Sequence, residues 1–230
     1  MRKLLFVLLS VLVVVAFAEN DLLILHCEGG DPLTGVENNI GTDPFYGSVD
    51  YLDGSTGLVD AATLGAYDCV FTWNNYQYTT GQGDELADYV DAGGTVVVLG
   101  WGIFQCYGRI LDDAAYCPID GGANEHGSTA LGTTYTHDIL DSVSTITGIN
   151  YRVAASLESG ATLIAEDTTF GDPLVAINAA ETVVAINMVA GDYISWSGDG
   201  WVLFNNAIQY LMSGGGSTIE ETTWGQIKAM

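Results

Sequence analysis

The chain has 230 residues, of which 48% are hydrophobic, and it carries 29 acidic residues against 5 basic ones, a formal net charge of −24. A surface this negative repels phosphate backbones and anionic lipid, which argues against nucleic acid and membrane surfaces as partners. The length and the hydrophobic content suit one domain with its own apolar core.

The N-terminus has the pattern of a secretory signal peptide over residues 1–18. Arg2 and Lys3 form a basic start, residues 4–15 form an apolar run, and Ala-Phe-Ala at residues 16–18 is a small-x-small cleavage site. Because the run is too short for a comfortable membrane span, we expect cleavage, no span afterwards, and a mature chain that begins near Glu19. The mature chain would keep three basic residues against 29 acidic ones, a formal charge of −26. We therefore predict an exported protein: extracellular, on the cell surface or periplasmic.

Apolar runs separated by polar segments predict alternating strands and helices in the first half of the chain. Runs that are apolar at every position are typical of strands covered on both faces, as in a parallel sheet. One expected helix has acidic residues in its first turn and Gly93-Gly94 after its end, which suits the helix dipole and helix termination. The expected strands are residues 22–27, 48–52, 69–73 and 95–99, and the expected helices are residues 58–64 and 83–92.

The second half of the chain predicts a long connection and then late strands closed by a helix. Residues 100–130 are rich in glycine and aromatic residues, and a connection of this length is usually functional or an inserted flap. Residues 200–212 have the amphipathic pattern of a helix, and the glycine-rich residues 213–217 predict a flexible linker. Between them we expect a short helix at residues 137–143 and strands at residues 151–154, 162–165, 174–177 and 182–188.

Several of these segments follow one another in a recognisable order. They are residues 22–26, 67–71, 86–94, 96–100, 137–140, 173–176 and 198–201. In this order they resemble the class I glutamine-amidotransferase-like superfamily, in particular its secreted members, over residues 21–212. The resemblance implies a flavodoxin-like α/β fold with an open, mostly parallel sheet, helices on both faces and late antiparallel strands. We expect this domain at residues 19–212. The linker or tail at residues 213–230 resembles segments that lead into C-terminal sorting modules.

The turn after the strand at residues 95–99 lacks the groups that the resemblance implies for catalysis. Active members are expected to place a cysteine in this elbow and to activate it with a later His-x-Glu pair, because the thiolate must stand exposed with a base in reach. Trp101 and Gly102 occupy the elbow here, and neither His126 nor His137 has a glutamate two residues later. We predict that amidotransferase chemistry is lost.

Side chains at the ends of the predicted parallel strands are candidates for a ligand-binding cleft. Ligands bind at this edge of such sheets, and aromatic rings beside amides suit a sugar or a peptide. The alternatives are a capping histidine beside a solvated acid, and rings that only pack under the long loop. For His137 the alternative is a helix cap or hinge. The candidates are His26, Glu28, Trp73, Asn74, Trp101, Gly102 and His137.

The four cysteines lie in the mature chain, where export permits disulfides. Cys106 and Cys117 flank a short segment and are the disulfide candidates, with Cys106 as an inert thiol or a nucleophile as the alternatives. Cys27 and Cys69 lie in strand-like runs that equally suit buried thiols. No cysteine or histidine spacing indicates zinc, and a calcium site fits no EF-hand spacing. We expect neither a metal nor a cofactor. The carboxylates that such a calcium site would use are Asp112, Asp113, Asp120 and Glu125.

The sequence favours one function and keeps two alternatives open. The favoured hypothesis is an exported, non-catalytic amidotransferase-like domain that binds a small molecule, a glycan or a protein at or outside the bacterial cell surface. The first alternative is a hydrolase acting on an amide, ester or glycan, with Cys106 or Glu28 working with a histidine. The second is a purely structural module of a larger surface protein.

Overall fold

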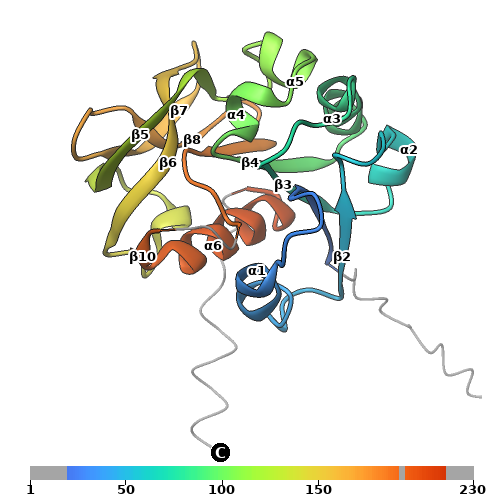
Figure 1. Ribbon diagram of the computed structural model, residues 1–230, viewed down its shortest axis with the longest axis horizontal. Coiled ribbons are helices and arrows are strands. Elements are labelled where there is room, and N and C mark those ends of the chain that lie inside the picture. The colour runs from blue at the N-terminus through green and yellow to red at the C-terminus, as the bar shows by residue number, and fades with distance from the viewer. Residues whose placement is uncertain (1–19, 192–194, 216–230) are drawn as a thin grey trace, which may run out of the picture.

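The protein is described from a computed structural model, which defines residues 20–191 and 195–215. The predicted signal peptide at residues 1–18 and the greater part of the predicted tail, residues 216–230, lie outside the described residues. Within them, ten strands form one open sheet in the order β10-β6-β5-β7-β8-β9-β4-β3-β1-β2 (Figure 1). In this part of the chain no helix is long and apolar enough to cross a membrane.

The elements follow the expected alternation along the chain. The strands are β1 (Asp21–Cys27), β2 (Ser48–Asp53), β3 (Cys69–Asn74), β4 (Thr95–Leu99), β5 (Ile119–Thr134), β6 (Ile146–Leu157), β7 (Thr162–Asp167), β8 (Pro173–Ile177), β9 (Val183–Ile186) and β10 (Ser197–Gly198). The helices are α1 (Thr34–Asn39), α2 (Ala61–Leu64), α3 (Gln82–Asp91), α4 (Gly102–Gln105), α5 (Arg109–Asp112), the 3-10 helix η1 (Asp138–Leu140) and α6 (Gly200–Met212).

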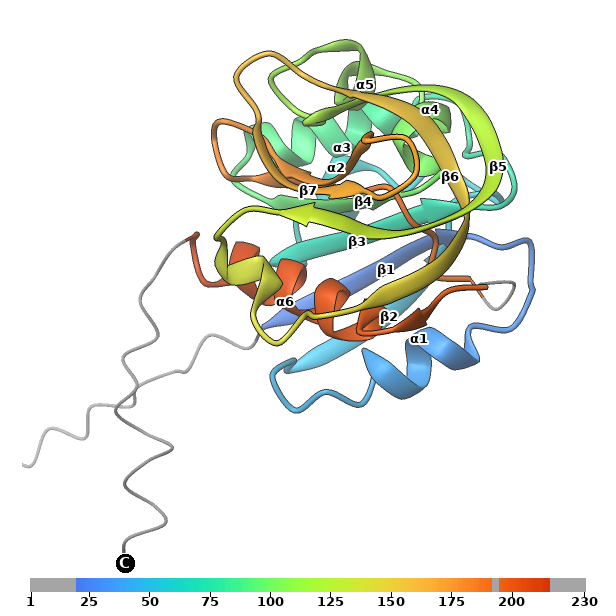
Figure 2. The ribbon, with the colours of Figure 1, turned by 90° about the vertical axis from the view of Figure 1, so that its left-hand side faces the viewer.

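Five strands form the parallel half of the sheet, in the order β2-β1-β3-β4-β9. This is the flavodoxin-like strand order, with β9 in the last place. Strands β3 and β9 are buried at every position, as the continuous apolar runs predict for strands covered on both faces. Figure 2 shows what covers them: α1 and α6 lie on one side of the sheet, and α2 to α5 on the other. The expectation of helices on both faces is confirmed.

The other half of the sheet is antiparallel, from β8 through β7, β5 and β6 to β10. The sheet as a whole is therefore mixed, and the expected mostly parallel pairing holds only for its first half. The reason is the connections. Residues 168–172 and 178–182 are short turns that join β7 to β8 and β8 to β9, and such turns can join only antiparallel neighbours.

Strands β5 and β6 form a long curved hairpin, which we call the flap (Figure 2). Residues 100–130, expected to be a loop, instead hold α4, α5 and much of β5. The short helix α1 lies between residues 27 and 48, where the sequence predicted no helix. The β5 sequence, with four glycines in sixteen residues, has no apolar alternation. Its strand conformation comes from pairing with β6, with register shifts after Gly121, His126 and Thr129.

Two apolar layers, one on each face of the sheet, form the core. On one face Phe71 of β3 lies edge-on to Phe204 of α6, with ring centroids 5.5 Å apart. On the other face the buried side of α3, including Leu86 and Tyr89, packs against β3 and β4. These layers fix the carboxyl ends of β1, β3, β4 and β9 at one edge of the sheet, where the candidate site lies.

Candidate functional site

The strained position of the elbow after β4 is Gly100. Its φ is +40°, a conformation that side chains rarely adopt, and its N–H donates to the Ile186 carbonyl at 2.9 Å. A Cβ at this position would collide with Cγ1 of Val189 and lie 2.8 Å from the Met188 carbonyl oxygen. An elbow nucleophile needs its side chain at this strained point, exposed above the sheet. Here the segment that follows β9 fills the space.

Trp101, which the sequence placed in the elbow, lies one residue further on and has helical backbone angles, φ −67° and ψ −19°. Its indole Nε1 donates to Oδ1 of Asn124 in β5 at 2.7 Å, and its ring lies edge-on to Tyr151 of β6 at 5.4 Å. Trp101 therefore contacts both strands of the flap and joins them to the end of β4.

Three of the predicted cleft residues meet at the carboxyl ends of β1 and β3. Trp73 Nε1 donates to Oε1 of Glu28, and Asn75 Nδ2 donates to Oε2 of the same carboxylate at 3.4 Å. The backbone N–H of Glu28 donates to Nδ1 of His26 at 3.3 Å, and the His26 ring lies 6.2 Å from the Trp73 ring. Desolvation lowers the pKa of His26, which favours the neutral ring that accepts this bond. Glu28 and Trp73 are fully buried, whereas His26 is 8% exposed and Asn75 is partly buried.

Asn74 and Gly102 lie beside this cluster. Asn74 Nδ2 donates to Oε1 of Gln105, while its Oδ1 is buried without a hydrogen-bond partner among the described residues. Gly102 is buried, and a Cβ there would lie 3.2 Å from the Tyr78 hydroxyl and 3.5 Å from the Trp73 Cα. The parallel strands thus bring His26, Glu28, Trp73, Asn74 and Gly102 to one edge, as expected.

His137 is not brought to this cluster. It is the N-cap of η1, where its Nδ1 accepts a hydrogen bond from the Ile139 N–H at 3.2 Å. Its ring lies 4.8 Å from Tyr210 near the end of α6, and the Tyr210 hydroxyl donates to Glu181 at 3.0 Å. The structure therefore gives His137 the capping role that the sequence kept as the alternative to a place in the cleft.

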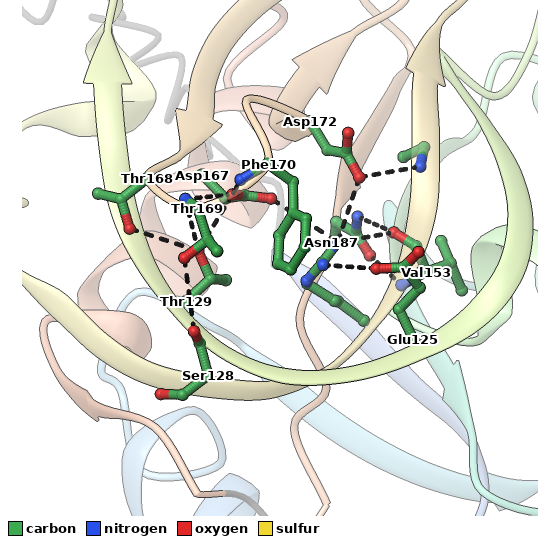
Figure 3. Close-up of polar contacts among 12 residues, drawn as sticks. Glu125, Ser128, Thr129, Val153, Asp167, Thr168, Thr169, Phe170, Asp172 and Asn187 are labelled. Carbon is green, nitrogen blue, oxygen red and sulfur yellow. Dashed lines mark hydrogen bonds and ion pairs between the residues drawn. The ribbon is translucent and has the colours of Figure 1, made fainter.

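Two side chains that the sequence did not single out attach the flap to the sheet. Asn187 follows β9 and contacts the backbone of Val153 in β6: its Oδ1 accepts from the N–H at 2.9 Å and its Nδ2 donates to the carbonyl at 2.8 Å (Figure 3). The signal available in the sequence is an asparagine directly after a wholly apolar strand. Since Val153 is buried, this amide satisfies backbone groups that water does not reach.

Arg152 is the second such side chain, and it is fully buried. It donates to Glu125 Oε2 at 2.7 Å and to Asp172 Oδ2 at 3.2 Å, and it lies 3.7 Å from Asp167 (Figure 3). The Phe170 ring covers its guanidinium at 3.8 Å. The signal was an arginine within an apolar strand of a chain that has only five basic residues. These contacts join both flap strands to the β7–β8 turn.

All four cysteines are free, buried thiols in the structure, so the expected Cys106–Cys117 disulfide is not formed in it. The Cys117 thiol instead contacts the Ile119 carbonyl at 3.2 Å. Burial raises the pKa of Cys106 well above its ordinary value, and the nearby Cys27 and Cys117 act in the same direction. Burial also raises the pKa of Cys117 to about 12. Such thiols stay protonated at neutral pH and are poor nucleophiles.

The described residues contain no group of three or more His, Cys, Asp or Glu side chains arranged to hold a metal ion. Of the carboxylates that the sequence raised for calcium, Glu125 is paired with Arg152, and Asp113 accepts a hydrogen bond from the Ala115 N–H at 3.0 Å.

Solved structures share this fold. A ThuA-like protein from Bacteroides uniformis is similar with a TM-score of 0.62 and 16% identity, over 86% of this chain and 93% of that one. A GMP-synthase-like protein from Thermoplasma acidophilum is similar with a TM-score of 0.57 and 13% identity, over 91% and 98%. A glutamine amidotransferase from Thermotoga maritima is similar with a TM-score of 0.54 and 14% identity, over 74% of this chain and 75% of that one. The sequence matches no family model and no curated protein. At these identities the likeness establishes the fold alone.

Proposed function

We propose that this chain is an exported, non-catalytic domain that binds a ligand or partner at or outside the bacterial cell surface. The proposal starts from its class I glutamine-amidotransferase-like fold, which the sequence resemblance also implied. One observation carries the non-catalytic part. The elbow that would present a nucleophile holds Gly100, and the space for a side chain there is taken by Val189 and Met188. A thiol or hydroxyl cannot stand at this point without moving the segment after β9.

The geometry gives the hydrolase alternative little support. Cys106 is fully buried with a raised pKa, whereas a nucleophilic cysteine needs an exposed, low-pKa thiolate. The Glu28 carboxylate is also fully buried, and it accepts hydrogen bonds from Trp73 and Asn75. The nearby His26 uses its Nδ1 to accept the Glu28 backbone N–H. These are contacts that hold the ends of β1 and β3 together.

An activity assay tests the non-catalytic part. The purified mature chain is assayed for ammonia release from glutamine and for hydrolysis of nitrophenyl esters and glycosides, beside the variants Cys106→Ser and Glu28→Gln. The expected result is no turnover above that of buffer for any of the three proteins. Turnover by the unmodified chain that either substitution abolishes would overturn the proposal in favour of the hydrolase.

Two mass measurements test the remaining parts. Expression of the full chain with its own N-terminus in a bacterium is expected to release a product that begins near Glu19, and a product that keeps residues 1–18 contradicts export. Alkylation of the native protein without reductant is expected to leave Cys106 unmodified, because the thiol is buried. Rapid native alkylation of Cys106 contradicts its assignment as an inert residue.

A further inference from the structure

We infer that a cavity beside the elbow, between the β3–α3 loop and the α4–α5 turn, is a binding subsite for a neutral carbohydrate. This inference rests on the proposed binding function and gives it a place and a ligand class. The cavity has a volume of about 320 Å³, which is at the lower end of the range for small-molecule sites. The polar and aromatic side chains that line it include Gln77, Thr79, Thr80, Asp84, Gln105 and Tyr107.

The walls of this cavity are held together by close backbone contact. A Cβ at Gly83 would collide with the carbonyl oxygens of Cys106 and Tyr107, and a Cβ at Gly108 would lie 2.7 Å from the Asp84 backbone nitrogen. The Arg109 N–H donates to Asp84 Oδ1 at 2.9 Å. The α4–α5 turn is thus fixed against the start of α3, and a preformed site loses less conformational entropy on binding.

Tyr107 is the group that points to a sugar. It lies on this fixed turn between the buried Cys106 and Gly108, yet 67% of its surface is exposed. Tyr76, next to the lining residue Gln77, is 52% exposed. An exposed aromatic ring on a fixed turn offers an apolar face against which the C–H face of a sugar stacks, and a hydroxyl for its polar edge.

The polar groups of the wall select the kind of ligand. Gln105 accepts from Asn74 with its Oε1, which orients its Nε2 amide as a hydrogen-bond donor at the cavity wall. The lining carboxylate of Asp84 and the net charge of −24 disfavour anionic ligands, so neutral hydroxyls suit this wall better than phosphates or uronic acids.

A larger cavity of about 530 Å³ lies near the amino ends of β3, β4 and β9 and is the weaker candidate. It is lined by turn residues and by the end of α6, including Asp68, Thr95, Glu181 and Met212, with no aromatic side chain. In open α/β sheets, ligands bind at the carboxyl ends of the strands, which is the edge where Tyr107 lies.

Calorimetric titration of the full mature chain with cellobiose, maltose, lactose and glucuronic acid tests the subsite. We expect millimolar binding of at least one neutral disaccharide and weaker binding of glucuronic acid. Tyr107→Ala should weaken disaccharide binding about fivefold to tenfold through the loss of stacking. The matched control is Tyr135→Ala, which removes a 44% exposed tyrosine that does not line the cavity and should leave binding unchanged.

Near-ultraviolet circular dichroism of each variant confirms that it is folded, and Gln105→Ala gives an independent second loss of affinity. The subsite is overturned if no neutral disaccharide binds, or if Tyr107→Ala and Tyr135→Ala bind equally well. Either result leaves the non-catalytic proposal standing, because that proposal is tested by turnover and by the reactivity of Cys106, and not by sugar binding. The two failures are therefore distinguishable in one protein preparation.

Discussion

The parallel strands and the flap are held in place by different kinds of contact. Strands β3 and β9 are buried at every position between two apolar layers. In β6, by contrast, buried positions alternate with partly and fully exposed ones. The flap is attached by named polar contacts: Trp101 to Asn124, Asn187 to Val153, and Arg152 to its three carboxylates.

This difference matters because the two kinds of contact fail differently. Apolar burial is spread over many side chains and is non-directional, so no single residue of the parallel half attaches it to the rest. A polar anchor depends on one geometry, and loss of one partner leaves the other buried and unpaired. We therefore expect single polar substitutions to loosen the flap while the parallel half stays folded.

Arg152→Met is expected to have the largest effect. It would leave the nearly buried Asp167 carboxylate without its cation, and breaking a buried pair in this way costs about 3–5 kcal/mol. Hydrogen exchange should speed up across residues 119–134 and 146–157 while the amides of β1, β3 and β4 keep their protection. The control is Arg109→Met, since Arg109 pairs with Asp88 and Asp91 on the surface and its loss should change exchange little. Equal loss of protection in both halves would show that the flap does not loosen independently of the parallel strands.

Gly100→Ala should have the second-largest effect on stability. It tests the elbow after β4, where the parallel strands meet the segment that anchors the flap. A side chain at positive φ costs about 1–2 kcal/mol, and the collision with Val189 adds overpacking of about 1–3 kcal/mol. The measurement is the free energy of unfolding in urea. Gly30→Ala isolates the collision, because Gly30 also has a positive φ, +91°, but no atom lies within 4 Å of its added Cβ. Equal losses in the two variants would mean that the elbow has room for a side chain.

The same division separates what the sequence could predict from what it could not. Residues 95–99 and 200–212 were predicted with the bounds that β4 and α6 have, because local apolar pattern and end signals determine them. The meeting of Glu28 with Trp73 followed from the rule that parallel strands end at one edge.

An inserted flap was one of the two expectations for residues 100–130, and residues 151–154 of β6 were predicted as a strand. The strand conformation of β5 escaped prediction because it comes from pairing with β6, and the Asn187 anchor escaped because it contacts a residue 34 positions away. The elbow was misplaced by one residue for a related reason. Only the backbone angles show that Gly100, and not Trp101, has the positive φ. His137, too, could be placed beside Tyr210 only by the fold.

Asn187→Ala is expected to have an intermediate effect, and it tests one anchor by itself. It removes both hydrogen bonds to the Val153 backbone, and leaving those buried groups unsatisfied costs about 1–3 kcal/mol. The Val153 amide and its neighbours in β6 should exchange faster, with little change in α3. Asn205→Ala is the control, because Asn205 contacts Tyr46 and the Asn39 carbonyl on the α1 side of the sheet. Faster exchange of β6 in the control would show that β6 is sensitive to any lost amide.

Asp199→Asn should have the smallest effect on stability. Its pH dependence tests whether a single exposed carboxylate helps to attach the flap. Hydrogen bonds from the Thr145 and Ser144 backbone N–H groups, at 2.9 and 2.8 Å, lower the pKa of this carboxyl below its ordinary 3.8 and hold the segment before β6 on the start of α6. A carboxyl whose pKa is lower in the folded than in the unfolded state contributes stability that is fully present above the unfolded pKa. That contribution is lost as the pH falls through the folded pKa.

The variant should therefore exchange faster than the parent at residues 144–157 at pH 7. The difference in urea stability should shrink as the pH falls below 3.8. Asp60→Asn is the counterpart in the parallel half, because hydrogen bonding to Thr63 also lowers the pKa of Asp60, the N-cap of α2. It should show the same pH dependence with faster exchange confined to α2. If Asp60→Asn loosens the flap as well, the two regions respond as one unit and the flap is not independently anchored.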